Sequence, residues 1–174
     1  MNELKIREAT ANDVDIIYDF IKGLAIYEKL ENEFIATKED LSKTIFELKQ
    51  ANVLIGFEQS GTQNIETQNN EPQNTEIPVC FALYFYNYST FLAKAGIYLE
   101  DLFVIPEKRS LGYGTKMLKH LVSLAVEKDL GRVEWSVLNW NTPAIKVYQK
   151  IGAKPQSEWT VYRLTNQSMK DFIA

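Results

Sequence analysis

The sequence predicts a mixed α/β (α+β) fold built around one central twisted sheet. Strand-like apolar stretches follow one another between residues 52 and 105, with no helical stretch among them. Beyond residue 105, strand-like and helical stretches alternate, and a helical stretch at 112–128 separates the strands expected at 97–105 and 133–137. Because a parallel pair of strands needs a long crossover such as a helix, we expect these two strands to be parallel neighbours.

The amino-acid composition limits the classes of protein to which this chain can belong. The 174 residues carry a formal net charge of −4, with 45% apolar and 24% charged residues, and we expect residues 1–174 to form one domain. The acidic balance argues against nucleic acid as a partner, and no apolar run is long enough to span a membrane. The single cysteine, Cys80, and single histidine, His120, argue against a disulfide or a Cys/His metal site. With no signal-like start, a cytoplasmic protein without a metal is expected.

The first part of the chain predicts two helices between two strands. Thr10 with Asp13, and Thr37 with Asp40, form the same capping pattern, in which the side chains at the start of a helix satisfy its first N–H groups. Apolar residues at helical spacing follow each pattern. The elements expected here are a strand at 4–7, a helix at 11–28, a helix through 41–48 and a strand at 52–57.

A polar segment at 59–77 interrupts this pattern. It contains three tandem units of the form x-Gln-Asn-x-Glu, at 62–66, 67–71 and 72–76. The segment has no apolar face to bury, and strand-like stretches flank it, so we expect a mobile, lengthened hairpin loop. A functional Gln/Asn-rich module is the alternative.

The remainder of the chain predicts four strands and three helices. An aromatic strand at 79–88 precedes a turn at 87–90, and Gly131 and Gly152 mark helix ends. Asn141 is a capping residue, with Pro143 tolerated in the first turn of the helix that follows. The elements expected after the turn are a strand at 97–105, a helix at 112–128, a strand at 133–137, a helix from 141 to 150, a strand at 158–164 and a short helix at 168–173.

The turn from Arg109 to Gly114 is the first candidate for chemistry. It has the form Arg-x-x-Gly-x-Gly between a strand that stops at Pro106 and a helix. Glycines let backbone N–H groups approach a ligand, a helix N-terminus favours anions, and an arginine adds a charge-assisted contact to phosphate. A plain strand-to-helix turn explains the same spacing equally well. The pattern lacks the Gly-Lys-Ser/Thr of a nucleotide P-loop and the third glycine of a dinucleotide fold.

With its neighbours, this turn resembles the acetyl-CoA signature of the GNAT superfamily of N-acetyltransferases. The resemblance extends over nearly the whole chain and is nearest to the diamine (spermidine/spermine) and thialysine acetyltransferase branch. It implies a GNAT-type fold, with helices on both faces of the mixed sheet. The residues that carry it are Tyr27-Glu28, 98–101, Phe103-Val104, 109–114, Trp140-Asn141, Pro143, Tyr148 and Gly152-Ala153.

The resemblance also implies roles on the cofactor side. The backbone at a splay of the sheet would pair with the pantetheine arm, the turn would hold the pyrophosphate, and Tyr148 would be the general acid that protonates the departing CoA thiolate. The amine would attack the acetyl carbonyl directly, without an acyl-enzyme. The expected cofactor-binding residues are Leu102, Phe103, Val104, Arg109, Ser110, Leu111, Gly112, Tyr113, Gly114, Thr115, Asn141, Thr142, Pro143 and Ala144.

On the acceptor side, carboxylates would attract a cationic amine and take a proton from it. The expected substrate-binding residues are Tyr27, Glu28, Glu100, Glu134, Trp135, Ser136 and Glu158, with Asp101 a further acidic candidate. The acceptor implied is a small-molecule amine, first a diamine, polyamine or thialysine-like compound, and the enzyme would be a homodimer. The alternatives are a non-catalytic acyl-CoA sensor and an acetyltransferase for a protein N-terminus or lysine.

Overall fold

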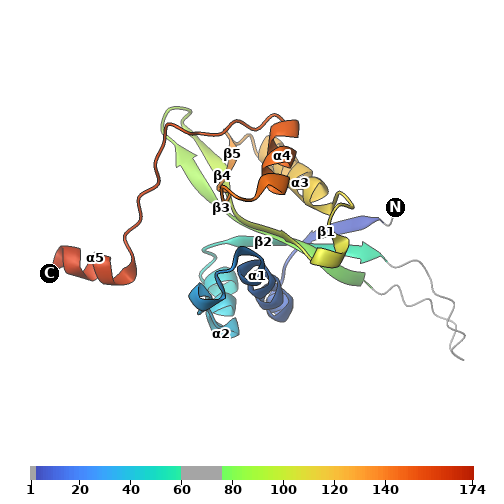
Figure 1. The fold of residues 1–174 in the computed structure, drawn as a ribbon, viewed down its shortest axis with the longest axis horizontal. Coiled ribbons are helices and arrows are strands. Elements are labelled where there is room, and N and C mark those ends of the chain that lie inside the picture. The colour runs from blue at the N-terminus through green and yellow to red at the C-terminus, as the bar shows by residue number, and fades with distance from the viewer. Residues whose placement is uncertain (1–2, 60–75) are drawn as a thin grey trace, which may run out of the picture. The chain divides into compact units, whose positions relative to one another are not determined.

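The computed structural model describes residues 3–59 and 76–174 (Figure 1). By its internal contacts the chain divides into two compact units, residues 1–136 and 137–174, and each is described by itself. The expectation of one domain over 1–174 stays a prediction. The interval 60–75, which holds most of the expected Gln/Asn-rich loop, lies outside the described residues. Gln59, Glu76 and Ile77, which that expectation included, belong to strands.

A five-stranded mixed sheet forms the centre of the first unit, in the order β1-β2-β3-β4-β5. Neighbouring strands are antiparallel from β1 to β4, whereas β4 and β5 are parallel and α3 lies between them in the sequence. The predicted mixed sheet and its parallel pair are therefore confirmed. The strands are β1 (Leu4–Glu8), β2 (Asn52–Gln59), β3 (Glu76–Ser89), β4 (Lys94–Val104) and β5 (Val133–Trp135).

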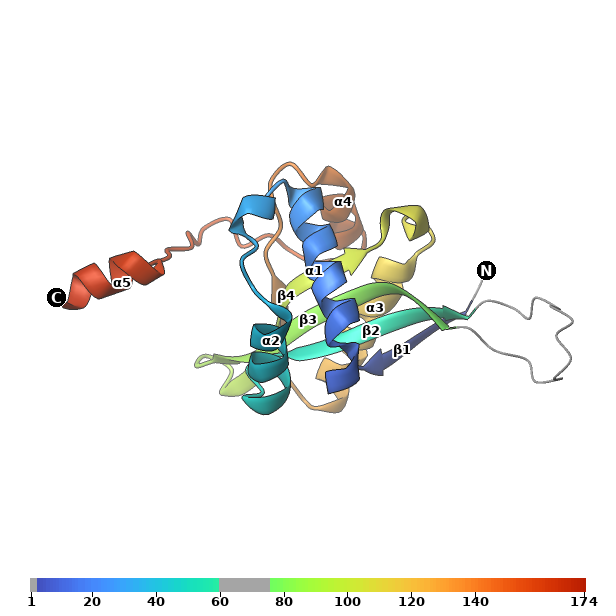
Figure 2. The ribbon, with the colours of Figure 1, turned by 90° about the horizontal axis from the view of Figure 1, so that it is seen from below.

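Helices cover both faces of this sheet, as expected. Figures 1 and 2 show α1 (Val14–Glu28) and α2 (Lys38–Leu41) on one face and α3 (Tyr113–Glu127) on the other. Alternation along β2 explains this division, because Val53, Ile55 and Phe57 belong to the core cluster under α1. Gly56 points to the opposite face, where a Cβ would lie 3.4 Å from the Met117 methyl group of α3.

The two predicted capping patterns form. The backbone N–H of Thr10 donates to Asp13 (2.7 Å), and Thr37 and Asp40 make the reciprocal pair before α2. Ala11–Asp13 is a 3₁₀ turn leading into α1, and Ser42–Glu47 is a π-helical continuation of α2. Apolar spacing over so few residues predicts a helix and does not distinguish a π turn from an α turn.

The second unit contains two helices, α4 (Thr142–Lys150) and α5 (Asn166–Ile173). The strand predicted at Glu158–Leu164 is wrong, because this segment has no regular structure. Trp159, Val161 and Tyr162 have strand-forming side chains and are 76%, 81% and 92% exposed. Strand propensity alone does not make a strand, since the backbone needs a neighbouring strand to pair with, and residues 137–174 contain no other.

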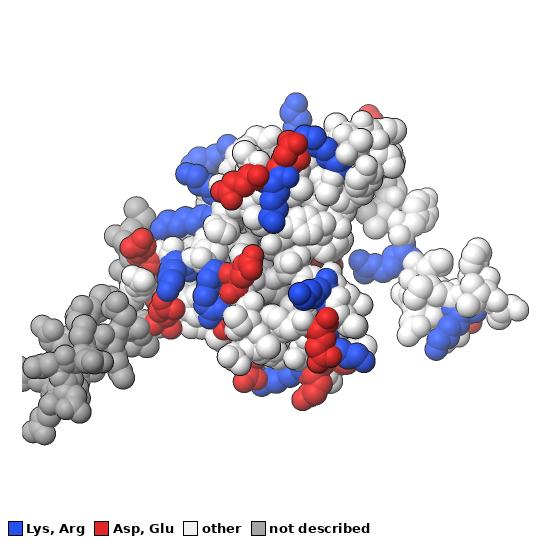
Figure 3. Space-filling view, turned by 180° about the vertical axis from the view of Figure 1, so that it is seen from behind, with Lys and Arg blue, Asp and Glu red and all other residues white. Residues whose placement is uncertain are grey.

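The turn predicted at 87–90 is displaced. Asn87 and Ser89 still pair with Gly96 and Lys94, and the chain reverses at 90–93. On the face in Figure 3, Lys and Arg side chains are interspersed with Asp and Glu, so neither sign forms a continuous patch. Within 3–59 and 76–174, every helix is too short or too polar to cross a bilayer.

Candidate active site

The sheet opens between β4 and β5. Their ladder consists of three pairs and ends at Leu99 with Trp135, whereas β4 continues to Val104. The edge of β4 beyond Leu99 is therefore left uncovered by β5. This opening is the splay that the sequence analysis expected at residues 102–104.

A β-bulge in β4 decides which backbone groups face the opening. Leu83 of β3 pairs with Asp101 and Tyr84 pairs with Leu99, so Glu100 is an extra residue that reverses the alternation of the strand. Before the bulge, the N–H of Ile97 points toward β5, where it donates to the carbonyl of Arg132 (3.0 Å). After the bulge, the N–H of Ile105 points the other way, to Val79 of β3 (3.0 Å).

The backbone N–H and C=O groups alternate in direction along a strand. The direction at Ile105 therefore gives the direction at each residue back to the bulge. The backbone groups of Phe103 point toward β3, and those of Leu102 and Val104 point into the opening. The side chain of Phe103 lies on the α1 face, in the core cluster. Of the three residues expected to contact pantetheine through the backbone, Leu102 and Val104 face the opening and Phe103 faces β3; the contact itself stays a prediction.

The turn before α3 has the geometry of an anion cradle. Ser110 and Gly112 both have left-handed backbone angles, with φ values of 63° and 82°. Successive turns of this kind make backbone N–H groups converge. The N–H of Lys116 donates to the carbonyl of Gly112 (3.0 Å), so α3 begins there and the first N–H groups of the helix have no partner within it. A Cβ on Gly112 would meet nothing within 4 Å, so this surface has room for a ligand.

Arg109 points away from this cradle. Its Nε donates to the carbonyl oxygen of Val104 (3.1 Å), and its guanidinium lies 4.1 Å from the ring centre of Tyr27 and 5.4 Å from that of Phe103. In this structure Arg109 therefore contacts α1, and its expected contact with phosphate stays a prediction. The side chain of Tyr113 is also buried, so only backbone groups of this residue can face a phosphate.

A cleft of ≈ 170 Å³ lies beside the bulge. Its walls come from the C-terminal half of α1, the 3₁₀ turn Glu31–Glu33, and β4. Three carboxylates, Glu28, Glu33 and Asp101, occur among apolar side chains. The lining residues are Ile21, Leu24, Ala25, Glu28, Leu30, Glu33, Phe34 and Asp101.

Burial and crowding of like charges change the acidity of this cleft. Burial, together with the charges of Glu100 and Glu28, raises the pKa of Asp101 to about 7. Burial also raises the pKa of Glu28. A carboxyl with a pKa near neutrality can accept a proton from an ammonium group, and the apolar walls suit the methylenes of an aliphatic amine.

Comparison with known proteins decides the family. The profile of the acetyltransferase (GNAT) family matches residues 24–153. The chain belongs to this family. L-ornithine N5-acetyltransferase NATA1 of Arabidopsis thaliana is 32% identical over 196 residues, covering 95% of this chain and 86% of the relative. Thialysine N-epsilon-acetyltransferase of Bos taurus is 32% identical over 170 residues, covering 95% of each protein.

The fold is also that of solved structures. Integron cassette protein VCH_CASS6 of V. cholerae has a TM-score of 0.73 at 22% identity, over 98% of this chain and 97% of that one. The predicted fold class and the predicted resemblance to GNAT enzymes are therefore confirmed. The protein is an acetyl-CoA-dependent N-acetyltransferase.

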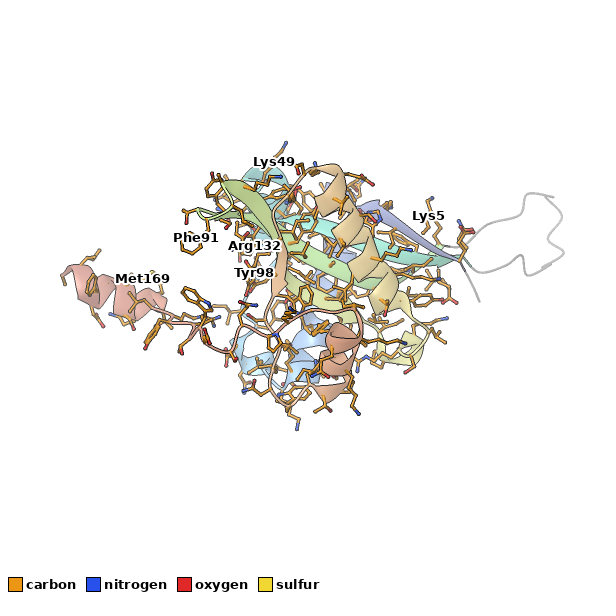
Figure 4. The ribbon with its side chains drawn as sticks, turned by 90° about the horizontal axis from the view of Figure 1, so that it is seen from above. Lys5, Lys49, Phe91, Tyr98, Arg132 and Met169 are labelled. Carbon is orange, nitrogen blue, oxygen red and sulfur yellow. The ribbon has the colours of Figure 1, made fainter. Side chains whose placement is uncertain are left out.

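Several residues of this acetyltransferase that were expected to bind the amine lie outside the cleft lining. Glu100 is exposed at the bulge, and Tyr27 holds the guanidinium of Arg109. Glu134 accepts from Asn87 (2.8 Å) and pairs with Arg132 (2.8 Å). Figure 4 shows Arg132 near Tyr98 of the adjoining strand.

The two other residues expected beside Glu134 also have structural partners. The Ser136 hydroxyl shares a hydrogen bond of 2.8 Å with Tyr98, and Trp135 forms the last pair of the ladder with Leu99. Asp101, by contrast, lines the cleft although the sequence favoured its neighbour Glu100. An acidic pair inside an apolar strand is the signal for this site, and the bulge determines which member faces the cleft.

The second unit of the acetyltransferase places Tyr148 on α4. The Asn141 side chain accepts from the N–H of Ala144 (3.3 Å), which confirms the predicted helix cap. Pro143 lies in the first turn, and Gly152, with a φ of 84°, follows the end of the helix. Tyr148 is half-buried in the middle of α4, and Glu158 lies in the exposed irregular segment beyond it.

Proposed function

We propose that this acetyltransferase transfers acetyl from acetyl-CoA to a primary amine of a small aliphatic molecule that carries a second cationic group. The observation that carries the proposal is the cleft in which Glu28, Glu33 and Asp101 lie among apolar side chains. Such a cleft matches a cation that has an apolar stem. Diamines, polyamines and thialysine-like amines have this chemistry. The names of the relatives, ornithine and thialysine acetyltransferases, agree with it.

The acetyl-CoA site would be formed by the opening of the sheet and the turn before α3. Backbone groups of Leu102 and the backbone N–H of Val104, whose carbonyl oxygen accepts from Arg109, would pair with the pantetheine arm and orient the thioester carbonyl. The turn from Ser110 to Thr115 would hold the pyrophosphate on converging N–H groups. Asn141 to Ala144 would also bind the cofactor, as the resemblance to GNAT enzymes implies.

The reaction would proceed in one displacement. Asp101 would take a proton from the ammonium group, directly or through water, and leave a nucleophilic amine. The amine nitrogen would form a bond to the carbonyl carbon, and the carbon–sulfur bond would break. Tyr148 would give its hydroxyl proton to the CoA thiolate. The proton that the new amide nitrogen loses would pass to the Tyr148 phenolate, directly or through water, so that the products are the acetamide and the free thiol.

The proposal is tested by the release of thiol from acetyl-CoA over a panel of amines. Aliphatic diamines should be acetylated faster than monoamines or peptides with a free N-terminus or lysine. Replacing Tyr148 by Phe should lower kcat by roughly a hundredfold, because the thiolate loses its proton donor. Binding of acetyl-CoA without turnover of any amine would indicate a sensor, and an unchanged kcat in Tyr148→Phe would overturn the assignment of the acid.

We further propose a cytoplasmic homodimer. Tyr86, Tyr88 and Phe91 are 43%, 62% and 95% exposed, and Figure 4 shows Phe91 at the tip of the β3–β4 hairpin. Exposed aromatic side chains close together on one hairpin favour a protein interface. Sedimentation of the full chain should give a dimer at micromolar concentration. A monomer under these conditions would contradict the proposal.

A further inference from the structure

A buried carboxylate lies behind the turn before α3 and contacts both of its ends. Glu58, near the end of β2, is only 4% exposed. Its carboxylate forms an ion pair with the ammonium group of Lys108, immediately before Arg109, and accepts a hydrogen bond from the hydroxyl of Tyr113, the first residue of α3. Lys108 and Tyr113 therefore flank the turn that contains Ser110 and Gly112.

We propose that Glu58 is a positioning residue that holds the pyrophosphate-binding turn in its working conformation; this rests on the cofactor site proposed above. Ser110 adopts a left-handed conformation that a residue with a side chain disfavours, so the surroundings must hold it there. Arg109 holds the turn at one point, because its side chain contacts the carbonyl oxygen of Val104 and the ring of Tyr27. Glu58 supplies the second point, because its carboxylate contacts residues on both sides of Ser110 and Gly112.

The charges around Glu58 agree with this role. The ion pair with Glu58 raises the pKa of Lys108, so the ammonium form persists. Burial and the neighbouring Glu58 charge raise the pKa of Tyr113, so its hydroxyl keeps the proton that it donates. Both partners thus stay in the protonation states that the contacts require. Loss of the buried carboxylate would release both ends of the turn at once.

The experiment compares two acyl donors in the full chain. Acetyl-CoA contains the pyrophosphate, whereas acetyl-pantetheine has the same thioester and lacks it. Glu58→Gln and Lys108→Met should raise the KM for acetyl-CoA by roughly tenfold and change kcat little, because contacts to a charged group are weakened. Neither variant should change kcat/KM for acetyl-pantetheine beyond twofold. Tyr113→Phe should give a smaller effect in the same direction.

Asp13→Asn is the matched control. Within residues 3–59 and 76–174, Asp13 is the other strongly buried carboxylate with a basic partner; it is 5% exposed, and its partner is Arg7. This control should lower the melting temperature without changing the KM for acetyl-CoA. Equal losses with both donors, or an equal rise of KM in the control, would overturn the role of Glu58. A wild-type enzyme that uses both donors equally well would instead overturn the cofactor site itself.

Discussion

The guanidinium of Arg109 lies 4.1 Å from the ring centre of Tyr27 and joins the turn before α3 to the helix that walls the cleft. We predict that this contact stabilises the fold by about 1 kcal/mol, a value typical of a partly desolvated cation over a ring. A double-mutant cycle with Arg109→Met and Tyr27→Leu, measured by denaturant unfolding, should show that coupling. Tyr27→Phe keeps the ring and should keep most of the coupling. Strictly additive losses would contradict the contact.

The acidity of Asp101 predicts a pH dependence. Its pKa of about 7 means that the carboxylate form, which accepts the proton, increases as the pH rises through neutrality. The kcat/KM for a diamine should therefore have a rising limb with a midpoint near 7. Asp101→Asn should lower kcat by roughly a hundredfold and remove this limb. Amines of different intrinsic pKa serve as controls, since a limb that shifts with the amine belongs to the substrate.

Ionisation of Asp101 has the opposite effect on stability, because it lowers the free energy of unfolding. The folded-state pKa of Asp101 lies above its ordinary value of 3.8, so folding favours the protonated form. This contribution is fully present below the ordinary value and is lost as the pH rises to about 7. The free energy of unfolding of Asp101→Asn should therefore fall less than that of the wild type across this range. Parallel curves would contradict the burial of the charge.

Strands β2 and β3 approach so closely at Gly56 that a side chain there would overfill the core. A Cβ on Gly56 of β2 would lie 2.5 Å from the Sγ of Cys80 on β3, which is fully buried. Gly56→Ala should therefore cost about 2 kcal/mol of unfolding free energy, the usual penalty for overfilling a core. Adding Cys80→Ala removes the sulfur and should recover part of this loss. A double variant with purely additive losses would show that the two atoms do not compete for space.

The sequence predicted the central sheet because its signals are local. Alternating apolar residues and capping pairs such as Thr37 with Asp40 act within one element, and their structures agree with the prediction. The strand at Glu158–Leu164 was predicted from the same kind of signal and is wrong, because pairing depends on a distant partner. Propensity cannot supply that partner.

The site was predicted less completely, for the same physical reason. Glycine spacing predicted the turn, and the acidic pair predicted a carboxylate beside the cleft that we propose for the amine. The bulge at Glu100 determines which backbone groups face the opening, and it arises from the register with β3. The contact of the Arg109 guanidinium with the Tyr27 ring likewise depends on residues far apart in the chain. Such contacts leave no periodic pattern in the sequence.

The acidic cleft is tested most directly by the ratio of kcat/KM for a straight-chain diamine to that for the monoamine of equal length. The ratio should exceed roughly tenfold in the wild type and fall toward one in Glu28→Gln, which removes a cleft carboxylate. Glu31→Gln is the matched control, because Glu31 is exposed on the adjoining turn and outside the cleft lining. Glu31→Gln should leave this ratio of kcat/KM values unchanged. A ratio near one in the wild type, or one unchanged by Glu28→Gln, would contradict recognition of a second cation by this cleft.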